Sequence, residues 1–319
     1  MVSGQLQEKE PNIPHYTPRP PITICPNSIT GGVGTFAGMK LLDSLISAVL
    51  PITPKPLVRV VAKKYIAGET LNDAMATVAR LNHEGTMATV DVLGEFVKNP
   101  DVARQETNNN IAVIEEITRR GVESNLSVKL TSLGLDIDKE FCWENMRRVF
   151  QAAARTGNFV RIDMENSPYT DSTIELARRA HAEFPGHVGI VLQAYLRRTQ
   201  QDIRQLAAEG MHFRLCKGIY VESEAIAFKG REEVQQNYLD CLNIILDHGC
   251  YVGIATHDDV LIDGARAIIA ERKLPPSSMN SRCCWACATP NAASLSGRVT
   301  TCGSMSRLVA TGTATPSAV

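Results

Sequence analysis

Charged and polar side chains recur at the ends of short apolar runs, and they are the residues of this sequence most able to do chemistry. They are Lys129, Asp163, Gln193, Arg214, Lys217, Thr256 and His257. A strand buried on both faces of a parallel sheet is normally apolar, so charges at its end need a function or a partner. Cations fixed in one place can bind an anionic small molecule and stabilise charge that develops during a reaction.

The elements that must position these residues alternate between strands and helices. Six β-branched runs are predicted strands: Met87–Leu93, Leu126–Leu130, Phe159–Met164, Val188–Ala194, Phe213–Cys216 and Tyr251–Thr256. Amphipathic stretches between them are predicted helices: Val102–Arg120, Glu140–Thr156, Asp171–Phe184, Thr199–Glu209, Glu232–His248 and Val260–Glu271. Asp171 and Thr199 are expected to cap two helices, and Gly121 and Gly157 to end two.

This alternation is typical of βαβ units and a parallel sheet, and an α/β barrel fits its length. In such a barrel the carboxyl ends of the strands meet on one face, where active sites lie. The polar residues at the strand ends are therefore predicted to line a single pocket.

Each of these residues also has a structural interpretation. Lys129, Asp163 and Arg214 could form an ion-pair network at the barrel rim, and we interpret Glu95 as a partner of such a rim cation. Gln193 could simply hydrogen-bond to backbone groups, and His257 could be a hydrogen-bonded histidine at a strand end. Lys217 could be a solvated charge at the rim.

Composition narrows the class of protein. The chain has 319 residues, 44% apolar content, 21% charged residues and a formal net charge of -1. No concentrated basic surface is expected, so we predict no nucleic-acid partner. The longest apolar stretch, Leu41–Ile52, is shorter than the roughly 20 residues that span a bilayer, and no secretory signal is recognisable, which favours a cytoplasmic protein. Nine Cys at scattered spacing favour reduced thiols.

The chain divides into three regions. Residues 1–38 contain six Pro and little periodicity, and we expect a disordered or mis-started leader, with Met39 as the natural start. Its segment Gly32–Gly38 imitates a dinucleotide-binding loop, but no strand precedes it. Residues 39–277 are the predicted barrel, and residues 278–319 form a separate tail.

Five motifs in the barrel region resemble proline dehydrogenase in its monofunctional bacterial form. They are Asn125–Leu130, Arg161–Glu165, Val191–Tyr195, Phe213–Tyr220 and Ile254–Asp258, and the resemblance runs from about Val58 to Ser277. It implies a (β/α)8 barrel that binds FAD noncovalently and oxidises L-proline to Δ1-pyrroline-5-carboxylate, the first step of proline catabolism. A quinone would accept the electrons, with peripheral contact at the inner membrane as an open alternative to a purely cytoplasmic location.

The resemblance also implies roles for single residues. Arg214 is expected near the reactive nitrogen of the flavin, Asp163 is expected to order the substrate pocket, and both are catalytic candidates. Lys129 is similar to the family's lysine that faces the proline carboxylate, and Tyr220 to an aromatic residue at the border of the flavin. The expected cofactor-binding residues are Met164, Gln193, Arg214, Lys217, Gly218, Ile219, Thr256 and His257.

The tail departs from the family pattern. From Arg272 onward there is no Asp or Glu, and four of the nine Cys occur there. The family continues with two more strands and a last helix whose adjacent arginines clamp the proline carboxylate, and we expect all of these to be lost. Cysteines 283, 284 and 287 have the spacing of a metal knuckle, but no folded context surrounds them.

A shifted reading frame explains the tail. Back-translated and read one base earlier, Met279–Cys287 becomes Tyr-Glu-Phe-Gln-Met-Leu-Leu-Gly-Val, which resembles the family's seventh strand. The same shift makes Gly303–Ala318 resemble the eighth strand and the start of the last helix. We therefore predict a frameshift, an open and aggregation-prone barrel, and an impaired enzyme.

Two other functions stay open. Lys129 or Lys217 at a strand end could form a Schiff base, as in a barrel lyase. A non-catalytic remnant is the other alternative.

Overall fold

The computed structural model describes residues 70–273, 279–283 and 301–308. Its strands are β1 (Met87–Val92), β2 (Ser124–Val128), β3 (Val160–Ile162), β4 (Val188–Gln193), β5 (His212–Cys216), β6 (Val252–Ala255), β7 (Met279–Cys283) and β8 (Thr301–Leu308). Its α-helices are α3 (Leu71–His83), α4 (Pro100–Arg120), α5 (Lys139–Thr156), α6 (Thr170–Glu183), α7 (Thr199–Ala208), α8 (Arg231–Asp247) and α9 (Asp259–Arg272), with a 3-10 turn η2 (Ser167–Tyr169) before α6.

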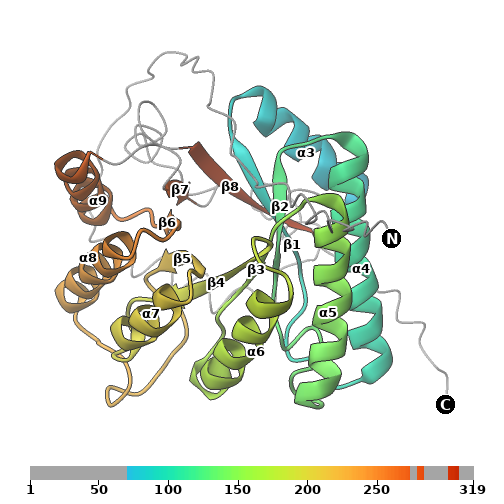
Figure 1. Ribbon diagram of the computed structural model, residues 1–319, viewed down its shortest axis with the longest axis horizontal. Helices are drawn as coiled ribbons and strands as arrows, with labels where there is room; N and C mark the ends of the chain where they lie inside the picture. Colours follow the sequence, from blue (N-terminus) through green and yellow to red (C-terminus); the bar gives the residue numbers. More distant parts are fainter. Residues whose placement is uncertain (1–69, 274–278, 284–300, 309–319) are drawn as a thin grey trace, which may run out of the picture.

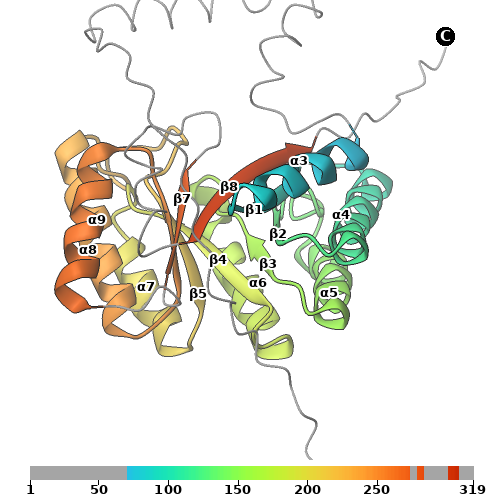
Figure 2. The same ribbon diagram turned by 90° about the horizontal axis from the view of Figure 1, so that it is seen from above.

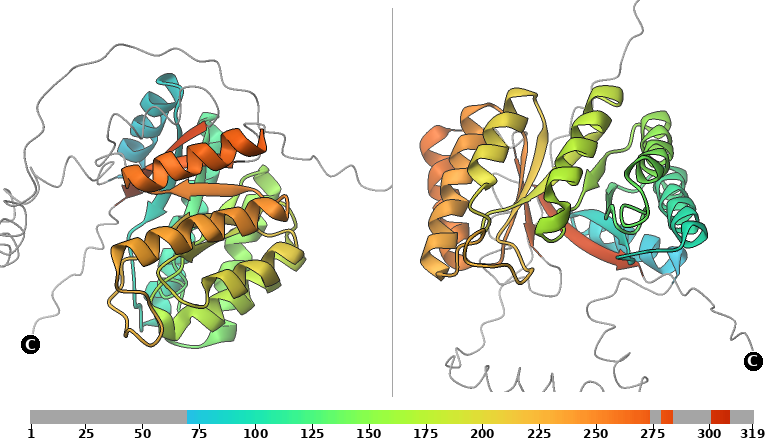
Figure 3. Two further views of the ribbon diagram at one scale, coloured as in Figure 1. Left: turned by 90° about the vertical axis from the view of Figure 1, so that its left-hand side faces the viewer. Right: turned by 90° about the horizontal axis from the view of Figure 1, so that it is seen from below.

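All eight strands are parallel, and each pairs with its neighbours in the sequence until β8 returns to β1 and closes a barrel. Helices lie outside the strands, with α7 to α9 on one side and α4 and α5 on the other (Figures 1 and 2). Helices α7, α8 and α9 pack side by side in sequence order (Figure 3). The predicted α/β barrel is confirmed, and each predicted strand and helix ends within two residues of the observed element.

The tail differs from the expectation. Two strands were expected to be missing, yet β7 pairs with β6 and β8 pairs with both β7 and β1. The expected open edges are therefore wrong at the level of the backbone. Strand pairing uses backbone N–H and C=O groups, which residues of many types can supply, and neither segment contains Pro. The final helix, the cysteine run beyond Cys283 and the leader lie outside the described residues.

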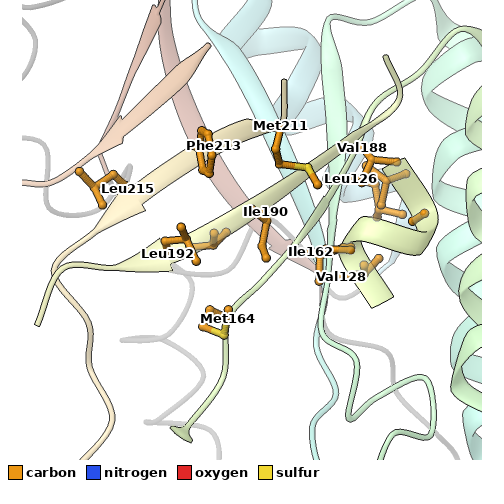
Figure 4. Packing of buried hydrophobic residues seen from close by; sticks show 14 of the residues in the cluster. Leu126, Val128, Ile162, Met164, Val188, Ile190, Leu192, Met211, Phe213 and Leu215 are labelled. Carbon is orange, nitrogen blue, oxygen red and sulfur yellow. The ribbon is translucent and has the colours of Figure 1, made fainter. Parts of the chain in front are cut away.

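Alternation along the strands separates an apolar outer face from a polar inner face. Leu126 and Val128 on β2 belong to the large buried apolar cluster, as do Ile162 and residues of β4 and β5 (Figure 4). Ser127, between the two β2 residues, instead donates to Asp163 inside the barrel. Because successive side chains point to opposite faces, apolar outer positions hold the helices while inner positions remain for polar residues.

Local signals fix several helix ends. Helix α4 begins with Pro100 after Asn99, whose side chain accepts from the N–H of Asp101 at 2.8 Å, and ends at Gly121 with φ 63°. Helix α5 ends in the same way at Gly157, with φ 67°. Both glycines have the left-handed conformation that favours this residue, so the predicted stops are confirmed.

The two expected caps, Asp171 and Thr199, are wrong. Asp171 lies inside α6, and Thr199 is the first residue of α7. The Thr199 hydroxyl donates to the carbonyl of Gln193 at 2.6 Å, so it ties the helix to the end of β4. In the part of the chain described here, no helix combines the length and apolarity needed to cross a bilayer.

Candidate active site

Lys129 follows β2 and lies buried among carboxylates. Its Nζ is 3.0 Å from Asp91 Oδ2, 3.8 Å from Asp163 Oδ2 and 3.9 Å from Glu95 Oε1. Burial lowers the pKa of Lys129, but the charges of Asp91 and Asp163 outweigh it and raise the pKa above its usual value. Lys129 is therefore a fixed cation at neutral pH, and Glu95 is confirmed as a partner of it.

Asp163 joins this lysine to the arginine of β5. Arg214 Nη2 donates to Asp163 Oδ1 at 2.6 Å, and Ser127 Oγ donates to the same oxygen at 2.5 Å. Burial raises the pKa of Asp163, but Arg214, Lys129 and the hydrogen bond from Ser127 together hold it below the ordinary range. The sequence grouped Lys129, Asp163 and Arg214, and the structure brings all three together.

Gln193, the last residue of β4, bonds to the chain that follows β3. Its Nε2 donates to the carbonyl of Met164 at 2.7 Å and to that of Glu165 at 3.3 Å. Its Oε1 is buried and has no hydrogen-bond partner among the described residues. The backbone role expected for Gln193 is thus present, and one acceptor remains unused.

Lys217, Thr256 and His257 lie around the start of α9. Lys217 Nζ is 3.2 Å from Asp258 Oδ2, and the N–H of Asp258 donates to Thr256 Oγ1 at 3.1 Å. Asp258 also accepts from the N–H of Val260, so it caps the helix and holds the lysine at once. His257 is exposed.

The loop after β5 carries Gly218, Ile219 and Tyr220. Gly218 has φ 107°, and a Cβ there would lie 2.1 Å from the ring of Tyr195, so only glycine fits. Ile219 is 86% exposed, whereas Tyr220 is half-buried. Burial raises the pKa of Tyr220, as do the charges of Glu95 and the carboxylates near it, so its hydroxyl stays protonated beside the Lys129 cluster.

Sequence inspection missed three residues that position this site. Asp91 pairs with Lys129, Ser127 donates to Asp163, and Asp258 binds Lys217. Asp91 carried a usable signal, because it is a charged residue inside a predicted buried strand. Ser127 carried none, since a serine in a strand is common and its partner is 36 residues away.

Comparison with known proteins decides the family. A family model described as "Proline dehydrogenase" matches residues 74–299. Proline dehydrogenase 2 of Bacillus subtilis is 40% identical over 213 residues, which cover 67% of this chain and 70% of that protein. The chain belongs to the proline dehydrogenase family. A proline dehydrogenase of Deinococcus radiodurans is 31% identical over 242 residues, covering 72% of this chain and 78% of that protein.

Solved structures agree on the fold. Proline utilization A from Bdellovibrio bacteriovorus superimposes with a TM-score of 0.71 at 22% identity, over 79% of this chain and 31% of that one. The protein of that name from Corynebacterium freiburgense gives 0.69 at 22% identity, over 86% and 32%. This chain therefore corresponds to less than a third of those longer proteins, and the likeness concerns the barrel.

Proposed function

We propose that this chain is an oxidoreductase that oxidises L-proline to Δ1-pyrroline-5-carboxylate with FAD as hydride acceptor and a quinone as the final acceptor. The observation that carries the proposal is the row Lys129–Asp163–Arg214, which sets two buried cations on either side of one carboxylate. We place the enzyme in the cytoplasm, and contact with the membrane surface would follow from a quinone partner.

The residues present fit a flavin. The buried Oε1 of Gln193 lacks a partner among the described residues and suits a ring N–H, while Arg214 and Lys217 offer cations to an electron-rich ring. Met164, Gly218 and Ile219 would border the ring, and Thr256 and His257 would hold the adenosine side. When bound, FAD supplies the acceptor for the hydride, which no amino-acid side chain provides.

The chain's own residues orient the substrate and its charges. Lys129, fixed as a cation, would face the proline carboxylate, and Tyr220 would close the pocket above it. Arg214 stabilises negative charge that develops next to it when a hydride leaves the carbon beside the proline nitrogen. Asp163 holds Arg214 in place through the 2.6 Å hydrogen bond, so its main role is positional.

The Schiff-base lyase is disfavoured by the same geometry. A lysine that attacks a carbonyl must lose its proton, and this usually requires a lowered pKa. Lys129 has a raised pKa because Asp91 and Asp163 surround it, and Lys217 is ion-paired to Asp258. Neither lysine has the environment of a nucleophilic amine.

We also propose that the chain as written is impaired. Lys129 already neutralises carboxylates, so it offers a substrate carboxylate little free charge, and a second cationic group is needed. The arginine pair implied by the family resemblance is missing, since the arginines after residue 272 are at 282, 298 and 307 and none are adjacent. A frameshift near Ser278 remains our explanation for that loss.

A single purification tests these proposals. The full chain is purified with added FAD, its visible absorbance is recorded, and L-proline is added without oxygen. Flavin absorbance that bleaches slowly, at proline concentrations far above those that saturate an intact relative, is the expected result. Covalent trapping of a lysine by borohydride and substrate would point to the lyase, and a colourless protein inert in both assays to a remnant.

A further inference from the structure

Among the residues whose burial the structure describes, Arg161 is the most buried cation and the one least well paired. It is 1% exposed, and within the described part of the chain its Nε and Nη1 have no hydrogen-bond partner. Its guanidinium lies 5.1 Å from the centre of the Phe159 ring, a contact that offsets only part of the cost of burial. Two buried guanidinium nitrogens without an acceptor among the described residues indicate that a partner is missing.

The neighbours of Arg161 cannot supply that partner. The groups whose charges reach it are Arg214 on β5, Asp163 next to its own strand, and Tyr251 before β6, and Arg161 in turn affects His212. Asp163 is already bound by Arg214 and Ser127. Burial lowers the pKa of His212 to about 4, so this side chain is neutral at pH 7. The described residues therefore place no free anion beside the guanidinium.

Strand β7 lies across the barrel from β3, with three strands between them on either side. In an eight-stranded barrel, alternate strands contribute the side chains of one layer, so β3 and β5 share layers with β7. The register pairs Arg214 with Gly253 and Gly253 with Asn280. Paired residues on parallel strands share a face, so position 280 falls on the same inner face as Arg214.

The register also relates position 280 to the surroundings of Arg161. The guanidinium of Arg161 lies beside the ring of Phe159, the residue just before β3, and that ring stacks on His212 at 5.7 Å. Position 280 is the second residue of β7, and the register links it through Gly253 to Arg214, the charge that acts most strongly on Arg161. An eight-stranded interior is just wide enough for side chains to fill, and an arginine and a glutamate from facing strands can meet in it.

We propose that Arg161 is one half of a core ion pair whose other half is an acidic residue at position 280. The tail as written has no Asp or Glu, so it cannot provide this group at any position. The shifted frame gives Tyr-Glu-Phe-Gln from position 279, which puts glutamate at 280. A structural defect and a codon argument thus indicate the same residue by independent routes.

The ion pair positions the catalytic row, because Arg161 is two residues before Asp163 and repels Arg214. The inference concerns stability and core charge, and its test requires neither FAD nor proline, so it can fail while the proposed oxidoreductase stands.

The test is a set of substitutions in the full chain, followed by thermal unfolding at pH 7. Asn280→Glu should raise the unfolding midpoint by about 5 to 10 °C, because a buried charge gains its partner. Asn280→Gln controls for size and hydrogen bonding. Ser281→Glu controls for added charge, since Ser281 pairs with Ile254 on the outer face. Neither control should raise the midpoint by a comparable amount.

Arg161→Met supplies the second arm. In the chain as written it should leave the midpoint unchanged or raise it, because an unpaired charge is removed. In the Asn280→Glu background it should lower the midpoint, and this reversal of sign identifies a pair.

The gain from Asn280→Glu should also vanish as the pH falls below the ordinary carboxyl value of about 4.3, since pairing depresses the folded pKa. The proposal is overturned if Asn280→Glu has no effect or keeps its full gain beside Arg161→Met. If the variants are too insoluble for melting, resistance to limited proteolysis gives the same comparison.

Discussion

At the carboxyl ends of the strands, Lys129 and Arg214 each lie within 3.0 Å of a carboxylate, whereas Arg161, lower in the same barrel, has two buried nitrogens without a partner among the described residues. The paired cations receive their carboxylates from β1 and from the end of β3. Arg161 depends on the strands of the tail. Burial is similar at both places, so the difference lies in which strands supply the anions. One barrel core can therefore hold paired cations at one end and an incompletely paired cation at the other.

Restoring the reading frame near Ser278 should have the largest effect, because it would change the strands on which the pairing of Arg161 depends. The restored tail would provide a family-like seventh strand, the eighth strand and the arginine pair of the last helix. We expect soluble yield and proline-dependent dye reduction to rise together, the latter by about 30-fold to about 5,000-fold, since a lost charge clamp costs about 2 to 5 kcal/mol. A resequenced gene that confirms the tail, together with full activity of the chain as written, would refute the frameshift.

Asp163→Asn tests the carboxyl end of the barrel, where the buried cations are paired. It removes the carboxylate between two buried cations, and we expect the free energy of unfolding at pH 7 to fall by about 3 to 5 kcal/mol. Since the folded pKa of Asp163 is depressed, its contribution is present above the unfolded value of about 3.9 and is lost as the pH falls. Urea unfolding at pH 7 and pH 3 should therefore show a smaller difference between parent and variant at pH 3.

A matched control is Glu175→Gln, which breaks the exposed pair with Lys139 at 2.8 Å. Its cost should stay within about 1 kcal/mol. Equal costs for the two substitutions would mean that burial does not distinguish these charges.

Arg214→Met separates chemistry from folding at the same end. In an intact-frame version we expect flavin reduction by proline to slow by about 10² to 10³-fold, because a cation that stabilises developing charge is lost. Stopped-flow absorbance measures the rate, and the flavin content of the purified variant reports on folding. Normal reduction kinetics would exclude the role assigned to Arg214.

Lys129→Ala should have the smallest effect on catalysis of these changes. A carboxylate contact acts on the ground state and the transition state alike, so the variant should raise the KM for proline about tenfold with little change in kcat. Lys139→Ala, an exposed lysine, is the control. A fall in kcat with an unchanged KM would assign Lys129 to the chemical step instead.

The sequence determined the barrel, because its signals are local and repeated. β-branched runs, amphipathic stretches and glycine stops such as Gly121 and Gly157 each depend on near neighbours along the chain. The same periodicity marked the strand ends, so the sequence alone groups Lys129, Asp163 and Arg214. The expected Thr199 cap failed because its hydroxyl found a partner in the tertiary structure, the carbonyl of Gln193.

The partners of the buried polar side chains depend on the tertiary structure. Ser127 reaches Asp163 across 36 positions, Arg214 reaches it across 51, and no periodicity encodes these contacts. The backbone ladder of β7 and β8 was likewise invisible, because pairing depends on N–H and C=O groups that most residues share. The sequence contained Arg161 and a tail without acidic residues, but only the register of the strands showed that position 280 shares the inner face with Arg214. Burial turns a residue type into a requirement for a partner, and burial is a property of the folded barrel.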